Sequence, residues 1–190
     1  VLDEGRAVVR TEIARGDTFV PARPSGGRIR LDSEFVADDV QLEKWFAAVA
    51  PRSVPDGFGT ARRMMSALVD ARIVMGGRMG VLSDPHDTYQ GAMPGIVEEA
   101  IVTLEAGKPL VVLGAFGGAA RDVAIALGLL DAEQEVPRGE QNATYWPSIE
   151  RVASLRDRIP GELRPFLAAV ADDDRAEQNA FRTARVIAQW

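Results

Sequence analysis

The sequence contains no cysteine, and His86 is its only histidine. Without cysteine the chain can form neither disulfides nor a thiolate nucleophile. One histidine without cysteine also argues against a structural zinc site. His86 stands in the polar run Ser83-Asp84-Pro85-His86-Asp87, so we interpret it as a surface residue rather than a catalytic one. We predict that the protein uses no metal and no cofactor.

Long apolar runs and excess positive charge are also missing. No apolar run approaches the ~20 residues that a membrane-spanning helix needs, and no signal-peptide pattern is present. The formal net charge of −6 at pH 7 argues against general binding to nucleic-acid backbones. The 190 residues, 46% of them hydrophobic, suffice for a domain with a substantial core. We expect a cytoplasmic protein that associates with neither membranes nor nucleic acids in general.

The middle of the chain alternates short apolar strands, glycine loops and helices. The predicted segments, in order, are a helix at 60–69, a strand at 71–75, the pair Gly76-Gly77, a polar loop at 78–92, a helix at 94–106, a strand at 110–113, a glycine loop at 114–118 and a helix at 119–129. The strand at 110–113 has no polar alternation, which is typical of a central parallel strand. This order predicts an α/β fold, a Rossmann-like doubly wound parallel sheet with helices on both faces.

The two ends of the chain are less regular. Proline and glycine predict loops at 21–27 and 51–59, and a helix start is predicted near Asp38. The C-terminal tail is predicted to be helical, with helices at 148–158, 162–170 and 175–190, the last continuous or interrupted near Thr183. We assign residues 58–190 to one ligand-binding domain. Residues 1–57 stay unassigned, and we expect them to be the start of the same domain.

Each of the two predicted strands ends in a glycine loop. In open parallel sheets, ligands bind beyond the carboxyl ends of the strands. Glycine lets the backbone approach a phosphate, and the following helix start offers free N–H groups. The alternative is that Gly76-Gly77 and Gly117-Gly118 only make tight turns. Neither loop is a Walker loop or a GxGxxG fingerprint, but the repeated arrangement favours binding of a nucleotide-type ligand.

Side chains in and near these loops could contribute to such a site. Arg78 could hold a phosphate with two hydrogen bonds, Tyr89 could stack on a base or bond a ribose, and Phe116 could stack on a base. The alternatives are a solvated arginine, loop packing and a core residue. Glu98-Glu99 suits a helix start, although a carboxylate beside a ribose could also polarise a glycosidic bond. We expect the long polar loop at 78–92 to be mobile without ligand and ordered with it.

Several blocks of the sequence resemble the SLOG superfamily, which unites SMF-type proteins, LONELY GUY phosphoribohydrolases and sensor domains of bacterial defence proteins. The blocks are Asp70-Ala71-Arg72-Ile73-Val74-Met75-Gly76-Gly77-Arg78, Met93-Pro94-Gly95-Ile96-Val97-Glu98-Glu99-Ala100, Leu104-Glu105-Ala106-Gly107-Lys108-Pro109-Leu110 and Gly114-Ala115-Phe116-Gly117-Gly118-Ala119-Ala120. Residues 58–130 are most similar to the sensor type, the tail is weakly similar, and residues 1–57 have no clear counterpart. With the loop geometry, the resemblance implies ligand contacts from Gly76, Gly77, Arg78, Tyr89, Pro94, Gly95, Ile96, Glu99, Phe116, Gly117 and Gly118.

The LONELY GUY signature is matched only in part. Those enzymes carry Pro-Gly-Gly-x-Gly-Thr-x-x-Glu and a catalytic arginine on the preceding helix, and Glu99 matches the signature glutamate. Residues 78–94 interrupt the signature, and Ile96 replaces its threonine. Ala61 stands at the expected arginine position, with Arg62 one residue away. These departures favour a binding pocket without hydrolase chemistry.

Three functions follow from these observations. The resemblance favours a sensor of a nucleotide-derived signal, ADP-ribose-like or cyclic-nucleotide-like. It further implies a homo-oligomer that controls a fused or associated effector in a bacterial defence system. The alternative is an N-glycosidic hydrolase of nucleoside 5′-monophosphates, in which Glu99 acts as acid/base and Arg62 or Arg78 binds the phosphate. A third reading is an oligomerisation module that binds no ligand.

Overall fold

The computed structural model describes residues 54–136 and 138–190. The chain divides into two compact units, residues 1–65 and residues 66–190. Helix α3 (Val54–Leu68) spans the boundary between them. The loop predicted at 51–59 is therefore wrong from residue 54 onward. Pro55 falls in the first helical turn, where its missing N–H costs nothing, and the buried Gly57 and Gly59 show packing overriding their low helix propensity. The loop predicted at 21–27 and the helix start near Asp38 lie outside the described residues.

Two short parallel strands form the centre of the second unit. β1 (Arg72–Met75) and β2 (Leu110–Leu113) pair along their whole length, with Ile73 opposite Val111. Helix α4 (Gly95–Glu105) connects them. The prediction of adjacent parallel strands joined by this helix is confirmed. Within the described residues the sheet has only these two strands. The described part of the chain therefore shows a small parallel sheet with helices packed around it, and the complete doubly wound sheet stays a prediction.

The two strands differ in burial. The first three residues of β2 are completely buried, as the unbroken apolar sequence predicts for a central strand. In β1, Arg72 and Val74 are buried, whereas Ile73 and Met75 are half exposed. This alternation is typical of a strand with one covered face. The core of the unit therefore lies around β2.

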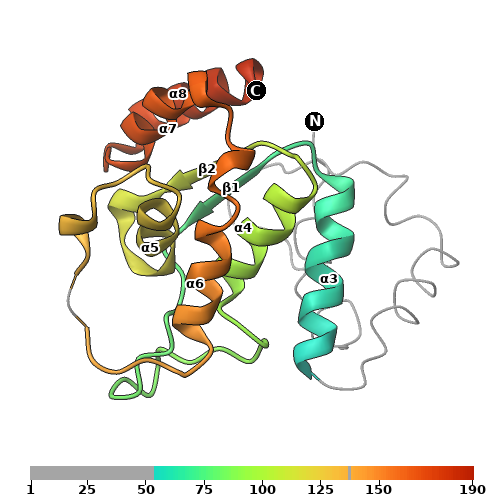
Figure 1. Cartoon of the computed structure of the whole chain (residues 1–190), viewed down its shortest axis with the longest axis vertical. Coiled ribbons are helices and arrows are strands. Elements are labelled where there is room, and N and C mark those ends of the chain that lie inside the picture. The colour runs from blue at the N-terminus through green and yellow to red at the C-terminus, as the bar shows by residue number, and fades with distance from the viewer. Residues whose placement is uncertain (1–53, 137) are drawn as a thin grey trace, which may run out of the picture. The chain divides into compact units, whose positions relative to one another are not determined.

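Helices surround the sheet and supply most of the core (Figure 1). The remaining elements are η2 (Gly114–Phe116), α5 (Gly118–Ala126), η3 (Ala132–Gln134), α6 (Tyr145–Ala153), η4 (Arg156–Arg158), η5 (Gly161–Leu163), α7 (Arg164–Ala171) and α8 (Ala176–Gln189). Figure 1 shows α7 and α8 side by side, and both contact β2. The predicted helical tail is confirmed, with α8 continuous through the buried Thr183. Among the described residues, no helix combines the length and hydropathy needed to cross a bilayer.

The polar loop at 78–92 is fastened to a second loop and to itself. Leu82 N donates to Glu140 O at 2.8 Å, and Asn142 N donates to Gly80 O at 2.8 Å. The carboxylate of Asp87 accepts hydrogen bonds from two backbone N–H groups at the start of the loop, at 2.9 and 3.0 Å. These contacts give the loop a fixed framework without ligand. The prediction that this loop is mobile without ligand and ordered with it stays a prediction.

Candidate functional site

The two glycine loops lie against each other at the carboxyl edge of the sheet. Adjacent parallel strands end on the same side, which brings Gly76-Gly77 after β1 beside Gly117-Gly118 after β2. Ala119 N donates to Gly77 O at 3.1 Å, and Ala120 N donates to Gly76 O at 2.8 Å. The carbonyl groups of the first loop therefore satisfy two N–H groups in the first turn of α5.

Two of the four glycines are required by this packing. A Cβ on Gly118 would lie 2.5 Å from the carbonyl oxygen of Gly77, and a Cβ on Gly77 would lie 2.5 Å from Cγ1 of Ile96. Both residues also have positive φ, 63° and 95°, which favours glycine. At Gly77 and Gly118, neighbouring atoms of the protein leave no room for a side chain, so no ligand is needed to explain why these residues are glycine. Both residues are needed for the packing of the two loops, and ligand contact at them stays a prediction.

The other two glycines face open space. Gly76 and Gly117 have φ values of 60° and 77°, and no heavy atom lies within 4 Å of a Cβ placed on either residue. Positive φ explains why glycine is favoured there, and the empty surroundings leave the backbone accessible. A ligand could approach the main chain at these two positions.

The start of α4 adds a second recognition element at this edge. Pro94 is buried and precedes Gly95, the first helical residue, and no side chain caps the helix. Ile96 lies in the first turn and is close to Gly77, as the Cβ distance above shows, so this helix start adjoins the glycine loops. The N-terminus of a helix attracts anions through its backbone N–H groups and its dipole. An anionic group bound here would lie beside the first glycine loop.

The three predicted side-chain contacts have different surroundings. Phe116 is 41% exposed, so its ring is accessible at the second glycine loop. Arg78 is exposed, but its Nη1 donates to Thr88 O at 2.6 Å, which ties it to the loop. The hydroxyl of Tyr89 lies 2.7 Å from Oγ1 of Thr144, so this ring fastens the loop. Of the three, Phe116 has an accessible ring, whereas Arg78 and Tyr89 are hydrogen-bonded to Thr88 and Thr144; ligand contact by all three stays a prediction.

Glu99 forms an ion pair that the sequence did not indicate. Its carboxylate lies 2.8 Å from Nη1 of Arg72, which is 92% buried at the start of β1. Nε and Nη2 of Arg72 have no hydrogen-bond partner. A charged residue heading the apolar run Ile73-Val74-Met75 was the signal that could have revealed this pair. Glu99 therefore has a structural partner on the sheet.

Arg62, the other residue of the hydrolase alternative, lies in the other compact unit. It is part of α3, and its guanidinium carbon lies 5.3 Å from the centre of the Phe58 ring. That distance is within the range of a cation–π interaction. The structure thus describes Arg62 in a local contact within its own helix.

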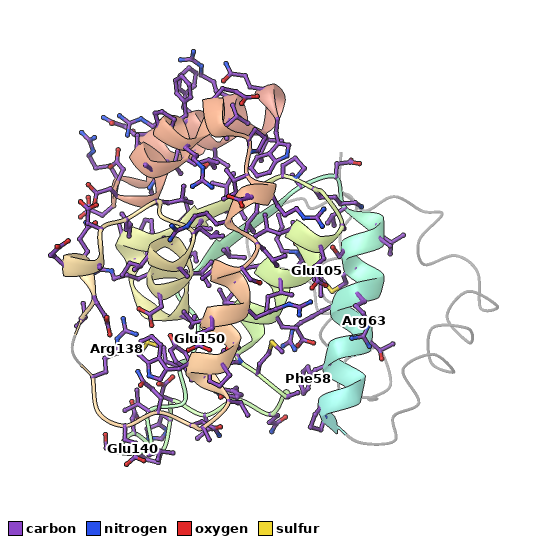
Figure 2. The ribbon with its side chains drawn as sticks, in the orientation of Figure 1. Phe58, Arg63, Glu105, Arg138, Glu140 and Glu150 are labelled. Carbon is purple, nitrogen blue, oxygen red and sulfur yellow. The ribbon has the colours of Figure 1, made fainter. Side chains whose placement is uncertain are left out.

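A buried polar cluster near the loops was also missed by the sequence analysis. Arg138 donates two hydrogen bonds to the carboxylate of Asp122, at 2.6 and 3.2 Å, and Tyr145 donates its hydroxyl to the same carboxylate. Burial, with the neighbouring Asp122 carboxylate, raises the pKa of Tyr145. Arg138, labelled in Figure 2, also contacts Sδ of Met79. The cluster thereby links α5 and α6 to Met79 in the polar loop. An aspartate among the alanines and valine of α5 was the available sequence signal.

The edge of the sheet thus combines open glycine backbone, an uncapped helix start and an accessible aromatic ring. These groups suit noncovalent recognition of an anionic small molecule that carries a ring system. Among residues 54–136 and 138–190, no group of three or more acidic or histidine side chains is placed to hold a metal ion.

A model of the family described as SLOG cluster2 matches residues 31–158. The matched region contains both glycine loops, α4 and the buried polar cluster, and it ends before α7 and α8. No curated protein and no solved structure shows significant similarity to the chain.

Proposed function

Because the chain belongs to the SLOG family, whose model covers more than half of it, we propose that it binds a nucleotide-derived small molecule where the two glycine loops meet. The family match confirms the resemblance seen in the sequence. The observation that carries the proposal is the pair Gly76 and Gly117, one on each loop, both with positive φ and both bordering open space. Backbone that is held open in this way is suited to close approach by a phosphate or a sugar.

The neighbouring groups support a nucleotide as the ligand class. The N-terminus of α4 would attract a phosphate, and the exposed Phe116 ring would stack on a base. Arg78 is exposed enough to reach an anion, although it would do so from a loop that it also fastens. ADP-ribose-like molecules and cyclic nucleotides combine these features and are the ligands we would test.

Sensing rather than hydrolysis is the activity we favour. A glycosidic hydrolase needs its carboxylate and its phosphate-binding cation held within about half an ångström of the productive geometry. Glu99 is paired with the buried Arg72, and Arg62 stacks on Phe58. Control of an effector in a bacterial defence system is proposed on the family resemblance.

Calorimetric titration of the full chain with AMP, ADP-ribose and cyclic ADP-ribose tests the proposal. In Gly76→Ala the added methyl group enters the open space, and we expect at least about ten-fold weaker binding, equivalent to about 1.4 kcal/mol. Gly107→Ala is the matched control, because Gly107 also has positive φ (67°) and open surroundings but follows the end of α4. Absence of binding to all three ligands, or equal loss in both variants, would contradict the proposed site.

A further inference from the structure

A groove between α5 and α6 forms a second accessible feature of residues 66–190. It has a volume of about 160 Å³ and is lined mainly by apolar side chains, including Ile125 and Ile149. Trp146 forms part of its wall and is 41% exposed. The exposed Glu135 and Glu150 also line it. The groove is therefore apolar with an acidic rim.

Local contacts hold one wall of the groove, and its acidic side chains form no ion pair among the described residues. Nε1 of Trp146 donates to Oε1 of Gln141 at 3.0 Å, and the Trp146 ring packs edge-on against Tyr145. Within the described part of the chain, neither Glu135 nor Glu150 forms an ion pair. Figure 2 labels Glu150 on α6. A partner that fits this groove would carry an apolar side chain next to a positive charge.

The same chain presents such a group on α8. Phe181 is 65% exposed, and the guanidinium of Arg185, one turn later, lies 5.9 Å from the centre of its ring. We call these two residues the Phe181 knob. Arg182 lies beside it, but its guanidinium is bound to Asp173 at 2.7 Å, so Arg185 provides the available charge. Glu177 lies one turn before Phe181 and Arg185 one turn after it on α8, so an acidic and a basic residue flank the ring along the helix.

We propose that the Phe181 knob of one copy of this chain docks into the α5–α6 groove of a second copy. The aromatic ring would fill the apolar groove, and Arg185 would face the carboxylates of Glu135 and Glu150. Burial away from water strengthens such charge pairs and favours correct partners over incorrect ones. This inference identifies surfaces for self-association and does not depend on the proposed ligand site.

The knob and the groove lie on different helices of the same unit. α8 packs on α7 and β2, whereas most residues that line the groove come from α5 and α6; Figure 1 labels these helices. Two copies that each place a knob in the other's groove form a closed two-fold dimer, whereas a one-way contact is heterologous and leaves a further free groove or knob on each added copy. One-way contacts close into rings or extend as filaments. A knob of two side chains makes a small contact, so the assembly should depend on protein concentration.

Sedimentation velocity of the full chain over a range of concentrations tests the proposal. Phe181→Asp removes the knob, and Ala153→Arg places a bulky positive charge in the groove, so each variant alone should be monomeric. Mixed together, they should form a one-to-one dimer and nothing larger, because one contributes an intact groove and the other an intact knob. Phe166→Asp is the control, since Phe166 is 52% exposed on α7 but outside the knob; it should assemble like the unaltered chain.

Charge reversal provides an independent test. Arg185→Glu and Glu150→Arg should each weaken association by up to about five-fold, and the double variant Arg185→Glu/Glu150→Arg should recover most of that loss. The proposal is overturned by an unaltered chain that is monomeric at every concentration, by Phe181→Asp assembling normally, or by a mixture of the two blocking variants that stays monomeric.

Discussion

Substitution of Gly118 by alanine should separate the two glycine loops. The added Cβ would lie 2.5 Å from Gly77 O and 2.6 Å from Gly76 C, and both are backbone atoms that cannot rotate away. The loops must therefore part, which weakens the hydrogen bonds from Ala119 N and Ala120 N to the first loop. Positive φ costs an alanine about 1–2 kcal/mol, and each lost hydrogen bond costs about 0.5–1.5 kcal/mol. We expect the free energy of unfolding to fall by about 2–5 kcal/mol.

Gly107→Ala isolates the contribution of the contact between the loops. Gly107 has φ of 67°, close to the 63° of Gly118, but a Cβ there meets no atom within 4 Å. This control should lose only the conformational term of about 1–2 kcal/mol. Urea unfolding followed by circular dichroism measures both variants, with equal m-values showing that the two can be compared. Equal destabilisation of the two variants would refute the argument that loop contact requires glycine at 118.

Three further outcomes are expected. Hydrogen bonds from Arg175 lower the pKa of Asp173 to about 2 from its ordinary value near 3.8. The ionised carboxylate therefore stabilises the fold above pH 4 and loses this effect as the pH falls toward 2; Asp173→Asn should reduce the drop in unfolding free energy over that interval, and an unchanged drop would argue against the pair. The purified chain should release no free base from a panel of nucleoside monophosphates, whereas release that disappears in Glu99→Gln would establish the hydrolase. Hydrogen exchange should find the Met79 amide protected without ligand, and Asp87→Ala should speed its exchange. Fast exchange of this amide in the unaltered chain would instead support a mobile loop at 78–92.

The sequence predicted the parts of the fold that depend on local pattern. The strands at 72–75 and 110–113 are short apolar runs, and α4 begins after Pro94 and ends before Gly107, as their backbone preferences require. The strand–helix–strand order then restricts the arrangement to a parallel pair. These segments were predicted to within one or two residues of their observed ends.

Features that depend on distant contacts were not predictable in this way. The four loop glycines look alike in the sequence, yet Gly118 is constrained by Gly77 O and Gly117 by no neighbour. Only the three-dimensional approach of the loops separates these roles. The ion pair of Glu99 likewise depends on a residue 27 positions earlier, Arg72. Pairwise contacts of this kind leave little trace in a single sequence.

The hydrogen bonds that join the loop at 78–92 to residues 140–142 are a second example of distant contacts that sequence pattern does not reveal. Length and polarity suggested mobility, because such loops often lack internal contacts. The structure pairs residues 80–82 with residues 140–142, about sixty positions later, a contact that the sequence analysis did not predict. Neither segment has the alternating apolar pattern of a strand, so periodicity could not reveal the pairing.

The C-terminal helices affect where this unit can be cut. The family match ends at residue 158, yet Leu167, Val170 and Val186 are buried and belong to the same core as β2. A chain shortened to the end of the match would bare apolar surface that α7 and α8 now cover. Exposed surface of this kind promotes aggregation. The unit that folds therefore extends beyond residue 158, where the family match ends. A fusion partner joined at residue 158 would replace α7 and α8, the two helices that complete the core.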